Sequence, residues 1–330
     1  MDSLNKLKHL NRRKLIKIIG YSTLSGFSFK NLAFSSSNLH KLKWEGSILN
    51  SPAKLILFAE NKRLGEKVID KVSNLAEKYD NIFNLQNDRS EIHLLNKNKS
   101  FADASDELID VIMKSKIISK ETLGAFDITV QPLWEMYYNH FILRSQTEPP
   151  SKETIKNTLR KVNWKNVTVL EKDIFLNANT SITLNGIAQG YITDKITNVL
   201  LKNGFKNNLV DFGETKVSGK FNNIRPWKIG LQGPDGVQDV INVMNKAVAT
   251  SGGYGTIFEP TITYHHIFNT NTGYSSNQYK AVSVISNEAW LSDAISTAAL
   301  SIKKNELVKI CKKFNLDIYI LNDVNFEKIS

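Results

Sequence analysis

Asp293 and Thr297 are the residues whose types and spacing point most directly to metal chemistry. They lie four positions apart in residues 291–298, which the apolar pattern predicts to be helical, and side chains at i and i+4 share one helix face. A carboxylate beside a hydroxyl oxygen suits a hard cation such as Mg²⁺. The segment fits equally well with a helix start that carries an aspartate in its first turn, so alone it leaves both interpretations open.

Two adjacent histidines follow a turn rich in hydroxyl groups and glycine. The apolar residues before that turn predict a strand that would present Thr250 and Ser251 to the phosphates of a ligand. His265 and His266 cannot easily chelate one ion together, because neighbours on a strand point to opposite faces. With an unperturbed pKa of ~6.5, His266 is a candidate acid or base. A lone histidine is, however, more often a structural residue.

Residues 183–194 predict a strand end, a glycine turn and a helix start. Free N–H groups at such a helix start bind phosphate, and Gly186 and Gly190 let the backbone turn tightly. The segment lacks the Gly-Lys-Ser/Thr of a Walker A motif and the spacing of a dinucleotide fingerprint. By itself, a plain strand–turn–helix junction explains it better.

Residues 124–134 place an aromatic ring, a carboxylate and a hydroxyl group close together after a helix. Phe126, Asp127 and Thr129 could bind a ligand there. The simpler interpretation is a helix end that packs Phe126 and Trp134 into the core, with Asp127 as a cap.

The elements that must position these residues favour an α+β fold. Strands and helices do not alternate regularly, which disfavours a doubly wound sheet and favours one compact domain with mixed or antiparallel sheets and packed helices. Residues 84–99 are polar and predicted to be irregular, and residues 144–152 are predicted to form a surface loop. The expected strands are 53–59, short segments within 167–184 and 207–286, and 316–321; the expected helices are 61–80, one from Ser105, 187–202 with Gly204 as its C-cap, 288–302 and 305–314.

Composition restricts the class of protein. The 330 residues are 41% hydrophobic and 23% charged, which is ordinary for a globular protein and sufficient for a large core. Cys311 is the only cysteine, which excludes an intramolecular disulfide and thiolate clusters held by this chain alone. No apolar run reaches the ~18 residues of a membrane-spanning helix.

The net charge of +11 is concentrated at the N-terminus. Residues 1–35 contain seven lysines and arginines and one aspartate, so they carry +6 and the remainder only +5. A body of this charge does not indicate a nucleic-acid surface. Arg12 and Arg13 precede a short apolar stretch, and this order resembles a twin-arginine export signal. We therefore expect residues 1–36 to be a leader and the mature protein to be periplasmic; a solvated basic arm on a cytoplasmic protein is the alternative.

The order and spacing of these segments resemble the FAD:protein FMN transferase family, known as ApbE. The resemblance covers residues 45–325, which we expect to form a single flavin transferase domain. The residues around Gln189, together with the leader sequence, resemble the branch of this family that contains NosX, which is associated with nitrous oxide reductase maturation. The matching motifs are Ser90-Glu91-Ile92 with Asn96, residues 124–129, 183–194 and 210–213, Ala247 to Gly252, the segment after His266, and the helix with Asp293 and Thr297.

The resemblance implies Mg²⁺-dependent transfer of FMN from FAD to a threonine hydroxyl of a target protein, with release of AMP. The expected acceptor is a periplasmic or membrane-anchored electron-transfer protein. His266 is the implied base, and Asp293 is assigned to the catalytic machinery as a metal ligand. The implied metal ligands are Gly186, Asp293 and Thr297, and the FAD contacts are Ala125, Phe126, Asp127, Gln189, Thr250, Ser251 and Phe268.

Four departures from the family pattern motivate an alternative function. Thr183 and Ser296 stand where many members have aspartate, Gln189 where many have lysine or glutamate, and Asn269-Thr270 where Asp-Pro is usual. Less negative charge would weaken Mg²⁺ or FAD binding. The alternatives are therefore a non-catalytic FAD-binding maturation factor for a periplasmic redox enzyme, and hydrolysis of FAD to FMN and AMP.

Overall fold

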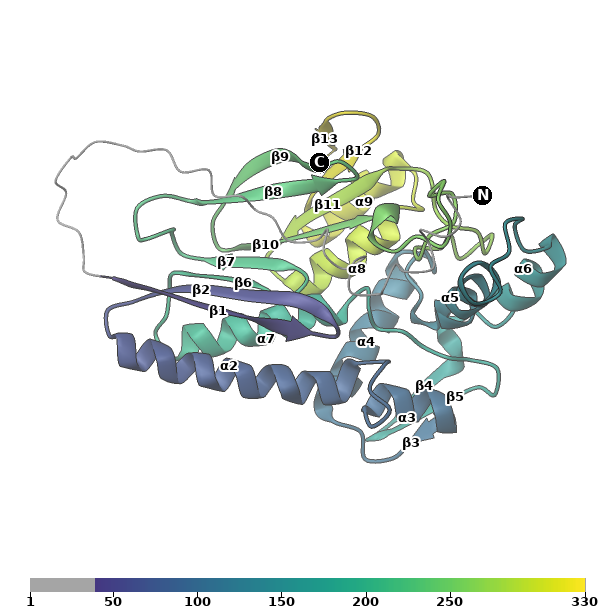
Figure 1. Cartoon of the computed structure of the whole chain (residues 1–330), viewed down its shortest axis with the longest axis horizontal. Coiled ribbons are helices and arrows are strands. Elements are labelled where there is room, and N and C mark those ends of the chain that lie inside the picture. Colours follow the sequence, from purple (N-terminus) through teal and green to yellow (C-terminus); the bar gives the residue numbers. More distant parts are fainter. Residues whose placement is uncertain (1–38, 330) are drawn as a thin grey trace.

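The computed structural model describes residues 39–329, and an antiparallel sheet of eight strands runs through it (Figure 1). The strand order is β1-β2-β6-β7-β10-β11-β12-β13. The β1–β2 hairpin therefore pairs with β6, from which it is separated in the sequence by a long, mostly helical segment. The strands are β1 His40–Ile48, β2 Ser51–Ala59, β6 Asn208–Asp211, β7 Thr215–Ser218, β10 Lys246–Gly252, β11 Ala281–Ser286, β12 Asp317–Leu321 and β13 Phe326–Lys328.

The two faces of this sheet are buried against different partners. In β2, Leu55 and Leu57 point to the helices, whereas Phe58 belongs to a second apolar cluster on the opposite face. That opposite face is covered by the ribbon of β8 (Trp227–Gly233) and β9 (Gly236–Val243). The helices on the first face are α2 Lys62–Phe83, α7 Ala188–Lys202, α8 Ala289–Ala299 and α9 Lys304–Phe314.

Residues 91–176 form a helical region beside the sheet (Figure 1). An aromatic cluster around Tyr137 packs this region against residues 258–268. Its elements are α3 Glu91–Asn98, α4 Asp106–Glu121, α5 Gln131–Tyr137, a π-helix Tyr138–Leu143, α6 Lys152–Leu159, and a small sheet of β3 Ser100–Phe101, β5 Asp173–Leu176 and β4 Val167–Leu170.

The predicted α+β class and most of the predicted elements are confirmed. The irregular segment predicted at 84–99 is wrong in its second half, because α3 forms there. Ser90 caps this helix by accepting the His93 N–H at 3.2 Å, and Ile92 and Leu95 bury its one apolar face. Polar residues on the other face concealed the pattern. The predicted leader, residues 1–36, lies outside the described residues. Within residues 39–329, no helix is long and apolar enough to cross a membrane.

Candidate functional site

Helices α7 and α8 pack so closely that the predicted metal ligands meet. A Cβ atom on Gly186 would lie 3.0 Å from Thr297 Oγ1, and one on Gly190 would lie 2.4 Å from the Ala289 carbonyl oxygen. Gly190 donates its backbone N–H to Asp293 Oδ2 at 3.0 Å. Glycine at these two positions therefore allows the carboxylate and the hydroxyl group of α8 to reach the start of α7.

Asp293 is an under-coordinated buried carboxylate. Asp293 is 3% exposed, and within residues 39–329 its carboxylate accepts one hydrogen bond, from the Gly190 N–H. Burial raises the pKa of Asp293 to about 7, and the Gly190 hydrogen bond opposes this rise. A charge held in this way is stabilised by a cation at its remaining oxygen.

A chain of hydroxyl groups joins α8 to β10. Ser296 donates to the Asp293 carbonyl oxygen at 3.0 Å, so Ser251 is the donor in the 2.8 Å contact between Ser251 Oγ and Ser296 Oγ. Ser251 Oγ can then accept from Thr297 Oγ1 at 3.4 Å, which leaves the lone pairs of Thr297 free. Ser296, which stands where many family members have an aspartate, thus has a structural role in this chain.

The donor set fits a hard cation. Asp293 supplies a carboxylate and Thr297 a hydroxyl oxygen, both donors of the kind that Mg²⁺ prefers, and the Gly186 carbonyl remains the third predicted donor. No group of three or more His, Cys, Asp or Glu side chains could hold a metal among residues 39–329. A cation at this site would therefore need further oxygens from substrate phosphates or water.

The two adjacent histidines have different environments. His265 is 1% exposed; its Nε2 donates to the Ser276 carbonyl at 3.0 Å and its Nδ1 accepts the Ile267 N–H, so both ring nitrogens are used internally. His266 Nδ1 donates to the Thr256 carbonyl oxygen at 3.1 Å, which places the lone pair of the neutral ring on Nε2. Burial and the neighbouring His265 lower the pKa of His266 to about 4. His266 is therefore neutral at pH 7 and able to accept a proton.

Some of the predicted FAD contacts lie beside the predicted metal ligands. Phe126 approaches within 3.5 Å of the Cβ position of Gly186, and Ala125 beside it is half-buried. The Gln189 side chain lies against Gly213, whose φ of +99° favours glycine. Thr250 Oγ1 and Ser283 Oγ are 2.7 Å apart on neighbouring strands. Ser251 reaches Thr297 and so borders the start of α7, whereas Thr250 lies on the opposite face of the sheet with Val248.

Asp127 and Phe268 have internal roles instead. Asp127 Oδ1 accepts the Thr129 N–H at 2.8 Å and its hydroxyl at 2.6 Å, and Oδ2 accepts the Trp164 N–H at 2.9 Å. Phe268 is 5% exposed and stacks on Tyr137 with the ring centroids 5.6 Å apart. The capping role of Asp127 matches the simpler interpretation of its segment, and the direct flavin contacts of both residues stay predictions.

The unusual Asn269-Thr270 pair has identifiable contacts. Asn269 Oδ1 accepts the Asn271 N–H at 2.9 Å, a bond that an aspartate oxygen could also make. Thr270 donates its hydroxyl to the Gly124 carbonyl at 2.7 Å, a bond that proline cannot form. This bond ties the 124–130 segment to the histidine segment. Thr183 Oγ1 accepts the Asn185 N–H at 3.3 Å within the turn before α7.

Glu214 is a carboxyl group near the site that the sequence analysis missed. Burial and then the charges of Asp293 and Asp211 raise the pKa of Glu214 well above its ordinary value, while a hydrogen bond from the Thr250 N–H lowers it. Thr193 of α7 donates to the Glu214 carbonyl at 3.0 Å. The only signal was its position directly after Gly213, at the end of the 210–213 motif.

Comparisons with known proteins agree with this geometry. Residues 49–320 match the ApbE family. An FAD:protein FMN transferase of Chlamydia pneumoniae is 30% identical over 246 residues, which are 70% of this chain and 74% of the relative. A Vibrio cholerae protein of the same name is 27% identical, over 74% of this chain and 72% of the relative.

Solved structures share the fold. The ApbE protein of Thermotoga maritima superimposes with a TM-score of 0.78 at 25% identity, covering 88% of this chain and 97% of that one. The flavin transferase ApbE from Vibrio cholerae gives a TM-score of 0.75 at 20% identity, with 88% and 96% covered.

Proposed function

The chain belongs to the ApbE family, and from this membership we propose that it is an Mg²⁺-dependent transferase that moves FMN from FAD to a threonine hydroxyl of a target protein and releases AMP. The observation that carries the proposal is the close packing of Gly186 and Gly190 on α8. It brings the Asp293 carboxylate and the Thr297 hydroxyl group to the start of α7, beside Phe126.

In the proposed reaction, the acceptor threonine oxygen attacks the phosphorus of the FMN half of FAD. The bond from that phosphorus to the bridging oxygen breaks, AMP leaves with the bridging oxygen, and a phosphoester to threonine forms. A bound Mg²⁺ would offset the negative charge of the pyrophosphate.

The residues of this chain would position the reactants and move one proton. His266 Nε2 takes the proton from the threonine hydroxyl, because the Nδ1 bond to Thr256 fixes the tautomer that leaves Nε2 free. Phe126 and Gln189 flank the start of α7, where they would hold the flavin nucleotide. Asp293, Thr297 and the Gly186 carbonyl would hold the metal ion.

Incubation of the full chain with FAD, Mg²⁺ and threonine-bearing acceptor fragments tests this proposal. We expect a covalently fluorescent fragment in a denaturing gel, and one AMP released for each FMN attached. Tight FAD binding without AMP release would instead identify a non-catalytic maturation factor. Free FMN with AMP and no labelled protein would identify a hydrolase. Either result, across several acceptors, contradicts protein flavinylation.

We further propose that residues 1–36 direct export to the periplasm, where the acceptor is an electron-transfer protein. The support is the Arg12-Arg13 pair before a short apolar stretch. Fractionation of cells that express the full chain should place it in the periplasm. Replacing both arginines with lysine should retain it in the cytoplasm, and unchanged export of that variant would contradict a twin-arginine leader.

A further inference from the structure

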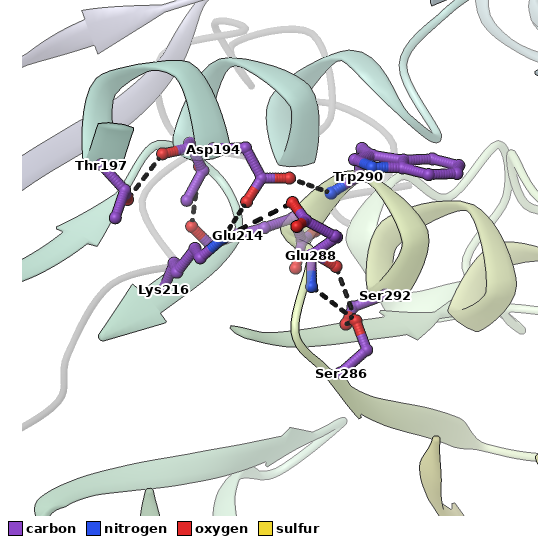
Figure 2. A network of polar contacts seen from close by, with 9 residues as sticks. Asp194, Thr197, Glu214, Lys216, Ser286, Glu288, Trp290 and Ser292 are labelled. Atoms are coloured by element: carbon purple, nitrogen blue, oxygen red, sulfur yellow. Dashed lines mark hydrogen bonds and ion pairs between the residues drawn. The ribbon is translucent and has the colours of Figure 1, made fainter. Parts of the chain in front are cut away.

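A buried charged network lies where β7, α7 and α8 meet (Figure 2). Lys216 Nζ of β7 lies 2.6 Å from Asp194 Oδ1 of α7, and these side chains are only 12% and 6% exposed. Glu288, at the start of α8, approaches the same lysine at 3.6 Å. The proposed reaction uses none of these three charged groups directly.

Asp194 caps α8 from another helix. The residue before α8, Glu288, makes no side-chain cap bond, and the first turn of α8 contains no acidic residue. Instead, Asp194 Oδ2 accepts the Trp290 backbone N–H at 3.0 Å. Ser286 secures the preceding backbone by donating to the Glu288 carbonyl at 2.7 Å and by its 2.8 Å contact with Ser292 Oγ (Figure 2). The N-terminus of α8 is thus fixed to α7 and β11.

The cap lies on the same helix interface as the metal ligands. Along α7, contacts recur every four residues: Asp194 meets Trp290, Gly190 meets Asp293, and Gly186 just before the helix meets Thr297. A helix rises about 1.5 Å per residue, so a slip of one residue at the cap would move both α8 ligands by about that distance. Metal sites and catalytic groups lose much of their effect over such displacements.

We propose that the Asp194–Lys216 pair is a positioning device that fixes the register of α8 on α7 and thereby places Asp293 and Thr297 for cation binding. The inference rests on the proposed function only in taking these two side chains as metal ligands. A buried ion pair is poor evidence of stabilisation, because desolvation offsets its attraction. A charged acceptor such as the Asp194 carboxylate does, however, bind the Trp290 N–H at the helix end more firmly than a neutral acceptor would. Lys216 compensates the negative charge of that buried carboxylate.

Direct binding of Mn²⁺, followed by its electron paramagnetic resonance signal, separates positioning from stability. The full chain is titrated with FAD present and no acceptor. The variant Asp194→Ala with Lys216→Met loses both the cap and the charges, and we expect Mn²⁺ affinity to fall about tenfold. Asp194→Asn with Lys216→Met keeps an oxygen for the Trp290 N–H, and we expect a loss of about threefold. As a matched control, Lys304→Met with Glu327→Gln removes the 2.5 Å ion pair between α9 and β13, away from α7 and α8, and should leave affinity unchanged.

Circular dichroism and urea unfolding establish that each variant is folded before it is titrated. A folded alanine variant that binds Mn²⁺ as tightly as the wild type would overturn the inference, even if it is less stable. Should that variant not fold, unchanged affinity in the asparagine variant would overturn it. Wild-type chain that fails to bind Mn²⁺ also overturns it. Wild-type chain that binds Mn²⁺ but labels no acceptor contradicts the proposed activity alone.

Discussion

Two buried aspartates, in the 124–130 segment and in α8, differ in how their charge is satisfied. Asp127 is 8% exposed and both its oxygens accept hydrogen bonds, from three donors in total. Asp293 is 3% exposed and accepts one bond, from Gly190. Burial alone therefore does not identify a ligand-binding carboxylate. What distinguishes Asp293 is a carboxylate oxygen that receives no hydrogen bond from residues 39–329. The two histidines differ in the same way, because both ring nitrogens of His265 are hydrogen-bonded within the protein whereas Nε2 of His266 keeps its lone pair.

The largest expected effect is the loss of labelling in Asp293→Asn. Removing the charge that would hold the cation should slow labelling at least about a hundredfold. If Asp293 instead has the structural role seen for Asp127, labelling will fall only in proportion to stability. Fluorescence of the acceptor fragment measures the rate, and Asp106→Asn, a side chain 84% exposed on α4, is the control.

The same variant should be more stable than the wild type at pH 8 without metal. Burial raises the folded pKa of Asp293 to about 7, above its unfolded value, so stability falls as the pH rises from about 4 to about 7 and stays low above that range. Asparagine avoids this cost, and we expect the free energy of unfolding in urea to rise by about 2 kcal/mol. The gain should shrink as the pH falls and disappear below about pH 4, where the wild-type carboxyl is protonated in both the folded and the unfolded state.

Asp127→Ala should show the opposite behaviour. It leaves the Thr129 and Trp164 N–H groups without their acceptor, so the free energy of unfolding should fall by about 3 kcal/mol. Mn²⁺ affinity of the folded variant should stay unchanged. Asp127→Asn, which retains one acceptor oxygen, should lose less. A folded alanine variant with normal stability would mean that the three hydrogen bonds do not stabilise the segment.

The pH dependence of metal binding sharpens the contrast further. Because a proton competes with the cation at Asp293, Mn²⁺ affinity should fall about tenfold per pH unit below about pH 7. His266, with its pKa lowered to about 4, stays neutral through this range and should not contribute. The slope should be preserved in Asp127→Asn and lost in Asp293→Asn; a slope that persists in Asp293→Asn would assign the proton to another group.

The smallest expected effect concerns the link between the 124–130 segment and the histidine segment. Thr270→Val removes the hydrogen bond to the Gly124 carbonyl and should cost about 1 kcal/mol of stability. Thr270→Ser retains the hydroxyl group and serves as the control. Equal unfolding curves for the valine and serine variants would show that methyl packing, rather than the hydrogen bond, fixes this loop.

Local patterns predicted the α+β class, most element positions, and a helix that carries Asp293 and Thr297. The continuous apolar run of β2 and the four-residue spacing of Asp293 and Thr297 are properties of short segments, so the sequence carries them. The saturation of Asp127 was not predictable, because its donor Trp164 lies 37 residues away. Glu214 and the Asp194–Lys216 pair were missed for the same reason: their roles depend on how α7, α8 and the sheet pack together.

The contact between Gly190 and Asp293 also bears on the order in which the protein matures. These residues are 103 positions apart, so α8 must be synthesised and docked on α7 before the site exists. Closing such a long loop is entropically costly and occurs slowly compared with forming a helix or a hairpin. If the chain binds metal as proposed, this competence should therefore appear late in folding. A nascent chain that ends before α8 would carry the start of α7 without Asp293 and Thr297.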